Sequence, residues 1–208
     1  MTDNYLLYYD DDKYLFEEVG PRFRQTGLID AFDLFSIISW KAQRDKSKLA
    51  DRLLRLVAPD GNLEKVAEKL SSELSKAKEP RDRLLLLMGK EWDFYLPMAS
   101  AILTVLWPVD FTVFDVRVCE ELDPDHKLNF RNIGNCSEAN IWPRYCGYLE
   151  AVRNSVPGEN LLRNKDRYLW GRSAARQLKH EIETCFEEAR ERSTKKAEEK
   201  KAKKQVQQ

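Results

Sequence analysis

The chain has 208 residues, 42% of them hydrophobic and 34% charged, which suits one globular domain with its own core. Basic and acidic residues both total 35, so no strong overall field attracts nucleic acid or acidic lipid. The charge is uneven, because residues 193–208 hold six lysines and two glutamates, a net of +4, which leaves −4 for residues 1–192. We expect one domain over residues 1–192, followed by a basic Lys/Glu-rich tail that is helical or disordered and flexible.

The composition also indicates the kind of protein. No two of the four cysteines have CxxC spacing, and neither histidine lies in a zinc-binding pattern with them. We therefore expect reduced thiols and no metal or other cofactor. The opening residues MTDNYLLYYDDDK do not have the pattern of a secretory signal, and the longest apolar run, residues 96–107, is too short to cross a bilayer. The expected location is the cytoplasm, without membrane contact.

Apolar residues recur at helical spacing through most of the chain, between proline and glycine turns. The predicted helices cover about residues 12–25, 30–44, 49–57, 63–74, 80–87, 97–106, 115–122, 138–156 and 164–192. Gly20-Pro21 is expected to interrupt the first of them, Asp30 and Ser137 to cap two others, and Pro59-Asp60-Gly61 to form a turn. Residues 111–114 have strand-like composition but no partner strand, so they are predicted to form an extended connector. The expected fold class is all-α, with eight to ten helices.

One carboxylate lies in the most apolar part of the sequence. Residues 97–118 read PMASAILTVLWPVDFTVFDVRV, and Asp115 falls between Phe114 and Val116. A helix is predicted to begin there, so Asp115 can serve simply as its N-cap. That interpretation explains the residue without any function.

The string ASAIL, a proline and then TVFDVRV resembles the helix-hairpin-helix DNA glycosylase superfamily. The resemblance is best over residues 84–122, and residues 161–170 and 20–44 add weaker similarity. It implies a compact multi-helix domain of the glycosylase type that engages duplex DNA and takes part in DNA repair. It also implies that Asp115 is the catalytic carboxylate, which stabilises the positive charge on the sugar as the glycosidic bond breaks.

Two departures from the superfamily pattern bear on activity. The superfamily's hairpin is usually a glycine-rich turn that binds phosphate through backbone N–H groups, whereas this chain has Asp93-Phe94-Tyr95-Leu96. The nearest glycine, Gly89, precedes Lys90. The place of the superfamily's nucleophilic lysine is held by Pro97, which cannot form a Schiff base. The resemblance thus implies monofunctional hydrolysis without lyase activity.

Several further residues have both a functional and a structural interpretation. Under the glycosylase hypothesis, the residues assigned to DNA contact are Gly89, Lys90, Tyr95, Arg117, Arg163 and Arg167. The aromatic cluster at residues 92–95 could instead pack the core, as could the aromatic face of residues 142–148. The basic stretch from Arg163 to Arg176 could instead pair with the acidic residues 10–12. The alternative to an enzyme is an inactive helical interaction module that keeps the fold but has lost phosphate binding at the hairpin.

Overall fold

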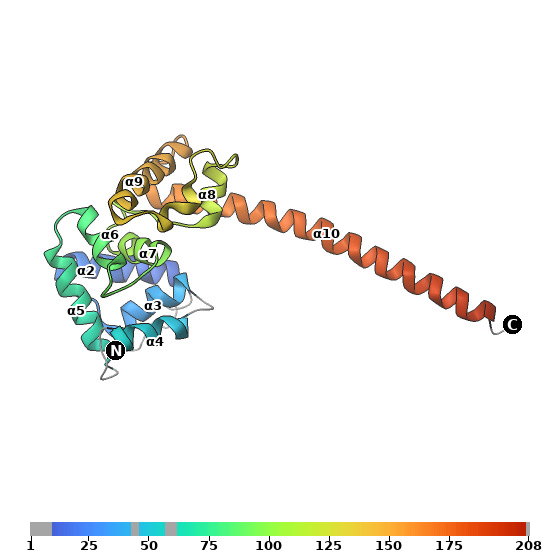
Figure 1. The fold of residues 1–208 in the computed structure, drawn as a ribbon, viewed down its shortest axis with the longest axis horizontal. Coiled ribbons are helices and arrows are strands. Elements are labelled where there is room, and N and C mark those ends of the chain that lie inside the picture. The colour runs from blue at the N-terminus through green and yellow to red at the C-terminus, as the bar shows by residue number, and fades with distance from the viewer. Residues whose placement is uncertain (1–9, 43–45, 57–61, 207–208) are drawn as a thin grey trace.

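The computed structural model describes residues 10–42, 46–56 and 62–206 (Figure 1). Within them the fold is all-α, as predicted, and no strand occurs. The helical segments are α1 (Asp11–Lys13), the π-helical turn η2 (Tyr14–Val19), α2 (Gly20–Thr26), α3 (Ala31–Lys41), α4 (Lys46–Leu56), α5 (Leu63–Lys76), α6 (Pro80–Met88), α7 (Leu96–Leu106), α8 (Val116–Leu122), the 3-10 turn η3 (Phe130–Asn135), α9 (Glu138–Ser155) and α10 (Leu162–Val206).

The helices form two groups around α7. Helices α2 to α5 lie on one side of it, and α8, α9 and the first turns of α10 lie on the other (Figure 1). Helix α7 is the centre of the core because ten of its eleven residues are buried. The rest of α10 projects from this body as a single long helix. None of the described helices has the length and apolar character that crossing a bilayer requires.

The predicted caps and boundaries of the first half are mostly confirmed. Asp30 and Asp33 form a capping box at the start of α3, in which each side chain accepts a backbone N–H of the other residue. Helix α3 ends at Lys41 rather than near Arg44, and residues 43–45 lie outside the described part of the chain. The predicted turn at Pro59-Asp60-Gly61 also lies outside it.

The expected interruption at Gly20-Pro21 is wrong. The chain stays helical from Asp11 to Thr26, because the π-helical turn η2 comes directly before Gly20. Pro21 has no N–H to donate to the preceding turn, and the wider turn makes room for its ring. Gly20 itself touches α7, since a Cβ at this position would lie 2.4 Å from the carbonyl oxygen of Val105.

The second half of the chain follows the predicted order. Residues 111–114 form the extended connector, and Asp115 caps α8 by accepting the backbone N–H of Arg117 at 3.0 Å. Helix α9 begins at Glu138 as expected, but the side chain of Ser137 makes no capping bond to the backbone. The helix α10 continues through the expected solvated tail as far as Val206.

Candidate functional site

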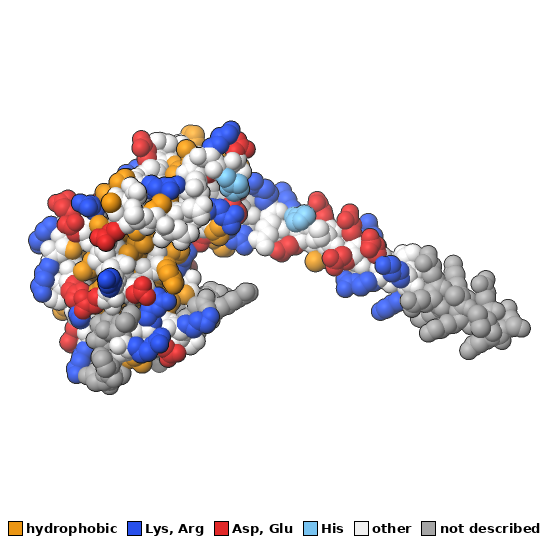
Figure 2. Space-filling model, viewed as in Figure 1, with side chains coloured by type: hydrophobic (Ala, Val, Ile, Leu, Met, Phe, Trp, Pro, Cys, Tyr) orange, Lys and Arg blue, Asp and Glu red, His pale blue; other side chains and the backbone are white. Residues whose placement is uncertain are grey.

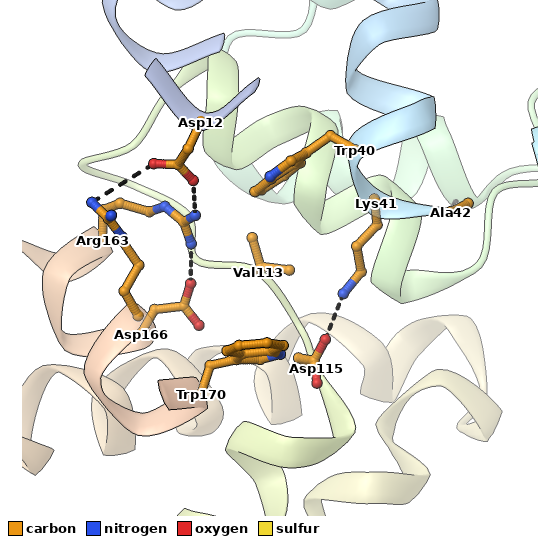
Figure 3. Close-up of a pocket in the computed structure, with 10 residues that line it drawn as sticks. Asp12, Trp40, Lys41, Ala42, Val113, Asp115, Arg163, Asp166 and Trp170 are labelled. Carbon is orange, nitrogen blue, oxygen red and sulfur yellow. Dashed lines mark hydrogen bonds and ion pairs between the residues drawn. The ribbon is translucent and has the colours of Figure 1, made fainter. Parts of the chain in front are cut away.

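A pocket of about 750 Å³ opens between the two groups of helices (Figure 3). One wall comes from α1 and the end of α3, and the other comes from the connector before α8 and the start of α10. The lining residues are Asp12, Trp40, Lys41, Ala42, Val113, Asp115, Arg163, Asp166, Arg167 and Trp170. The pocket therefore combines two indole rings with six charged side chains.

The extended connector places Asp115 in this pocket, and side chains of other helices hold the connector in position. The hydroxyl of Tyr145 donates to the carbonyl oxygen of Thr112 at 2.6 Å and accepts its N–H at 3.2 Å. The hydroxyl of Tyr148 donates to Val113 O at 2.9 Å, and Ser100 Oγ accepts the N–H of Phe114 at 2.8 Å. Buried backbone groups that belong to no helix need such partners. The aromatic face of α9 is thus a core element, as its structural interpretation predicted.

Asp115 is both a helix cap and a pocket residue. Its Oδ1 accepts the N–H of Arg117, and its Oδ2 lies 2.7 Å from Lys41 Nζ. Both side chains are mostly buried, with 16% of Lys41 and 20% of Asp115 exposed. The cap uses one oxygen only, so the two interpretations of Asp115 are compatible.

Arg163 organises the opposite end of the pocket (Figure 3). It forms ion pairs with Asp12 of α1 and, at 2.5 Å, with Asp166 Oδ2. Its guanidinium carbon also lies 5.2 Å from the ring centroid of Trp40. Arg167 reaches the same Asp12 at 3.7 Å. The basic stretch thus pairs with the acidic residues 10–12. This pairing was the alternative to phosphate contacts in the sequence analysis.

Asp166 is the most deeply buried acid of the pocket, with 3% of the residue exposed. Burial raises its pKa to about 6, although the positive charges of Arg163 and Lys41 act in the other direction. A carboxyl group with this pKa exchanges protons near neutral pH, which is the property of a general acid or base.

Two tryptophans bound the open space of the pocket. Trp40 from α3 and Trp170 from α10 lie on opposite sides of it, and Val113 lies between them (Figure 3). The guanidinium of Arg117 packs 5.4 Å from the ring centroid of Trp170, on α10. Indole faces in this arrangement suit a flat aromatic ligand.

The structure brings only some of the residues assigned to DNA contact together. Arg163 and Arg167 share the pocket with Asp115, while the side chain of Arg117 lines a separate depression beside α8 and α10. Tyr95 is 69% exposed and lines a third depression of about 390 Å³, next to the pocket. Gly89 and Lys90, at the end of α6, line none of these three cavities.

The turn between α6 and α7 is closed by a cation. Asp93 has a φ of 49°, in the left-handed region that glycine occupies most easily. Its carbonyl oxygen accepts a hydrogen bond of 2.5 Å from Arg52 Nη1 of α4. Trp92 and Phe94 are buried in the core, as their structural interpretation predicted. This turn therefore differs from a phosphate-binding hairpin in charge as well as in sequence.

Seven of the ten lining residues were not assigned to the site from the sequence, among them Trp40, Lys41, Asp166 and Trp170. Trp40 and Lys41 end a helix that looked purely structural, and Asp166 and Trp170 lie in a basic stretch that suggested phosphate contacts or pairing with the acidic residues 10–12. Helical spacing does carry one signal, because Arg163, Asp166, Arg167 and Trp170 recur at three and four residues and so share a face. The described residues contain no cluster of three or more histidine, cysteine or acidic side chains that could hold a metal ion.

Comparison with known proteins identifies no relative. No family model, no curated protein and no solved structure matches this chain. The function therefore has to be argued from the pocket itself.

Proposed function

We propose that this protein is a monofunctional DNA glycosylase that binds a flipped-out nucleotide in the pocket and hydrolyses its N-glycosidic bond. The observation that carries the proposal is the position of Asp115, whose carboxylate lines an open pocket instead of being covered by packed side chains. A volume of about 750 Å³ is within the usual range of small-molecule sites and is ample for one nucleotide.

The charges of the pocket fit the transition state of this reaction. Breaking the bond between the sugar and the base places positive charge on the sugar, and a fixed carboxylate stabilises that charge. Lys41 and the helix cap fix the two oxygens of Asp115 in place. No rearrangement of Asp115 is then needed when the charge develops.

The two tryptophans of the pocket suit the base of the flipped-out nucleotide. A base that leaves the duplex loses its stacking, and stacking on an aromatic side chain restores about 1–3 kcal/mol. Trp40 and Trp170 supply such faces on both sides of the pocket. This support is independent of Asp115, because it comes from α3 and α10.

The neighbouring depression suggests where the DNA strand lies. It shares Lys41 and Ala42 with the pocket, and it is also lined by Tyr95, Lys48 and Arg52. Two basic groups and an exposed aromatic ring beside the mouth suit a nucleic-acid backbone and an unstacked base. On the face of the body drawn in Figure 2, basic and acidic side chains are mixed. We therefore expect the DNA contacts to be confined to the pocket and the depression beside it.

The experiment is base release from duplexes that contain uracil, hypoxanthine, 8-oxoguanine or N7-methylguanine. We expect the parent protein to release at least one base and to leave the abasic strand uncut, without an adduct after borohydride reduction. Asp115→Asn should lower release by about 100-fold or more, because it removes the charge. Asparagine is also a good N-cap, so this variant should lose only the stability that the ion pair with Lys41 supplies and should stay folded.

Three results would each contradict a part of this proposal. A folded parent that releases none of the four bases and does not bind an abasic-analogue duplex at low salt would contradict the proposal. Release that is unchanged in Asp115→Asn would contradict the role of Asp115. A borohydride adduct that is lost in Lys41→Gln would show that the lysine in the pocket acts as a nucleophile, and the monofunctional assignment would then be wrong.

The alternative is an inactive interaction module, and the turn between α6 and α7 is the observation that favours it. Asp93 adds negative charge there, and Arg52 occupies its carbonyl oxygen. A module of this kind would bind the abasic-analogue duplex weakly or not at all, and Asp115→Asn would not change that binding.

A further inference from the structure

We propose that Asp166 is the general acid of this reaction and donates a proton to the departing base, while Asp115 faces the sugar. The assignment rests on the proposed function and divides the chemistry between the two carboxyl groups of the pocket. It gives Asp166, which the sequence did not single out, direct contact with the substrate base.

The geometry separates the two acids. They lie at opposite ends of the Trp170 indole, so a base that stacks on this ring has one acid on each side (Figure 3). Asp166 Oδ2 is held by Arg163 at 2.5 Å. Its other oxygen accepts no hydrogen bond from the described residues, although the side chain lines the pocket. One oxygen is therefore fixed, and the other can hold a proton toward a ligand.

The environments of the two acids match the two roles. Asp115 is paired directly with the ammonium of Lys41 and serves a helix N-terminus, both of which favour the charged carboxylate. Asp166 is buried, and burial raises its pKa to about 6. A buried acid with a raised pKa beside a carboxylate that a cation holds is the usual arrangement for a general acid and an electrostatic stabiliser.

The reaction balances with these groups and water. The bond between C1′ and the base nitrogen breaks, and its electron pair stays with the base. The carboxylic acid of Asp166 donates its proton to a ring nitrogen or exocyclic oxygen of the base, which leaves as a neutral molecule. Water adds to C1′ and loses one proton to solvent, and solvent returns a proton to Asp166.

The charges around Asp166 set the expected pH dependence. Arg163 on the same helix and Lys41 on α3 lower its pKa, and Asp115 raises it. Asp12 and Arg167 complete the charged groups of the pocket and pair with each other. Because the acid must be protonated, base release should increase as the pH falls through about 6.

The test compares the parent with Asp166→Asn on two purines in the same duplex, over a range of pH. Hypoxanthine needs a proton to leave, whereas N7-methylguanine already carries a positive charge. Loss of a general acid costs about 100-fold or more. We therefore expect that loss for hypoxanthine, less than about threefold for N7-methylguanine, and no increase in rate through pH 6.

Two further variants separate this role from a structural one. Asp166→Glu keeps the acid and should restore part of the hypoxanthine activity. Arg163→Gln removes the neighbouring cation, so the rise in activity should move to higher pH. Direct titration of the Asp166 carboxyl by carbon NMR should give a midpoint near 6 in the parent.

The outcomes show separately whether Asp166 is the general acid and whether the protein is a glycosylase at all. If the parent releases base and Asp166→Asn slows both purines equally with an unchanged pH profile, the general acid is not Asp166, although the glycosylase proposal stands. If the parent releases no base, both proposals fail together. An NMR midpoint near 4 would also exclude the role of Asp166.

Discussion

The ammonium of Lys41 lies 2.7 Å from Asp115 Oδ2, although 74 residues separate them in the chain. Each charge also occupies the helix end that suits it, because Lys41 is the last residue of α3 and Asp115 caps the first turn of α8. The pair joins the two groups of helices at the pocket. A change at this pair should therefore affect both the stability of the fold and the proposed activity.

Replacing Lys41 with methionine should affect both properties. The change leaves the mostly buried carboxylate of Asp115 without its cation, and we expect the free energy of unfolding to fall by about 2 kcal/mol. Base release should fall by about tenfold, because Asp115 loses one of its two fixed contacts. Urea denaturation and the duplex assay measure the two effects.

The control for this change is Asp115→Ala, which removes the cap as well as the ion pair. Its cost in stability should exceed that of Asp115→Asn by about 1 kcal/mol, the typical value of an N-cap. A Lys41→Met protein with unchanged stability and unchanged rate would mean that the ion pair is incidental to the site.

The fold was more predictable from the sequence than the site, and Asp115 shows why. Its role as a cap follows from neighbouring residues, as do the cap at Asp30 and the place of Pro97 in the first turn of α7, because caps and proline positions act within one turn. Its partner Lys41 comes from a distant helix, and no local rule relates the two residues. The misplaced break at Gly20-Pro21 has a similar origin, since Gly20 and the π-helical turn before it lie against the distant helix α7.

The two glycines Gly20 and Gly147 give a matched test of that packing. Both are helical, but a Cβ at Gly20 would meet the backbone of α7 at 2.4 Å, whereas a Cβ at Gly147 has no neighbour within 4 Å. We expect Gly20→Ala to lower the free energy of unfolding by about 1–3 kcal/mol through overpacking. Gly147→Ala should raise it by about 0.5–1 kcal/mol, because alanine is the better helix former. If Gly20→Ala is also stabilising, the start of α2 and α7 do not approach each other this closely.

The buried network around Asp33 predicts a loss of stability at alkaline pH. Burial and a hydrogen bond to Asp33 raise the pKa of Tyr14 to about 12, from about 10 in the unfolded chain. The folded state therefore favours protonated Tyr14, and this contribution is complete below pH 10 and is lost as the pH rises toward 12. Urea denaturation of the parent should show falling stability over this range.

The variant Tyr14→Phe isolates the contribution of Tyr14 to this loss of stability at alkaline pH. Tyr145 and Tyr148 are also buried with raised pKa values, so the variant should still lose stability at alkaline pH, but less steeply than the parent. Equal slopes in the two proteins would show that Tyr14 ionises as easily in the folded state as in the unfolded one.

The variant Tyr95→Ala tests the proposal that DNA lies in the depression beside the pocket. Tyr95 is 69% exposed, and among the described residues its one ring contact is with the side chain of Arg52, 5.1 Å from the ring centroid, so Tyr95→Ala should leave the melting temperature almost unchanged. Loss of stacking should weaken binding to an abasic-analogue duplex by about tenfold, without a change in salt dependence. Fluorescence anisotropy at two salt concentrations measures both quantities.

The matched control is Tyr168→Ala, because Tyr168 is 55% exposed on α10 and lines none of the three cavities. It should bind the duplex as the parent does. A third variant, Lys48→Ala, should weaken binding and lower the salt slope by about one unit, since a phosphate contact is electrostatic and stacking is not. If Tyr95→Ala and Tyr168→Ala weaken binding equally, the DNA does not reach the pocket from the side of α4. The strand would then have to enter past α8 and α10, where Arg117 lines the remaining depression.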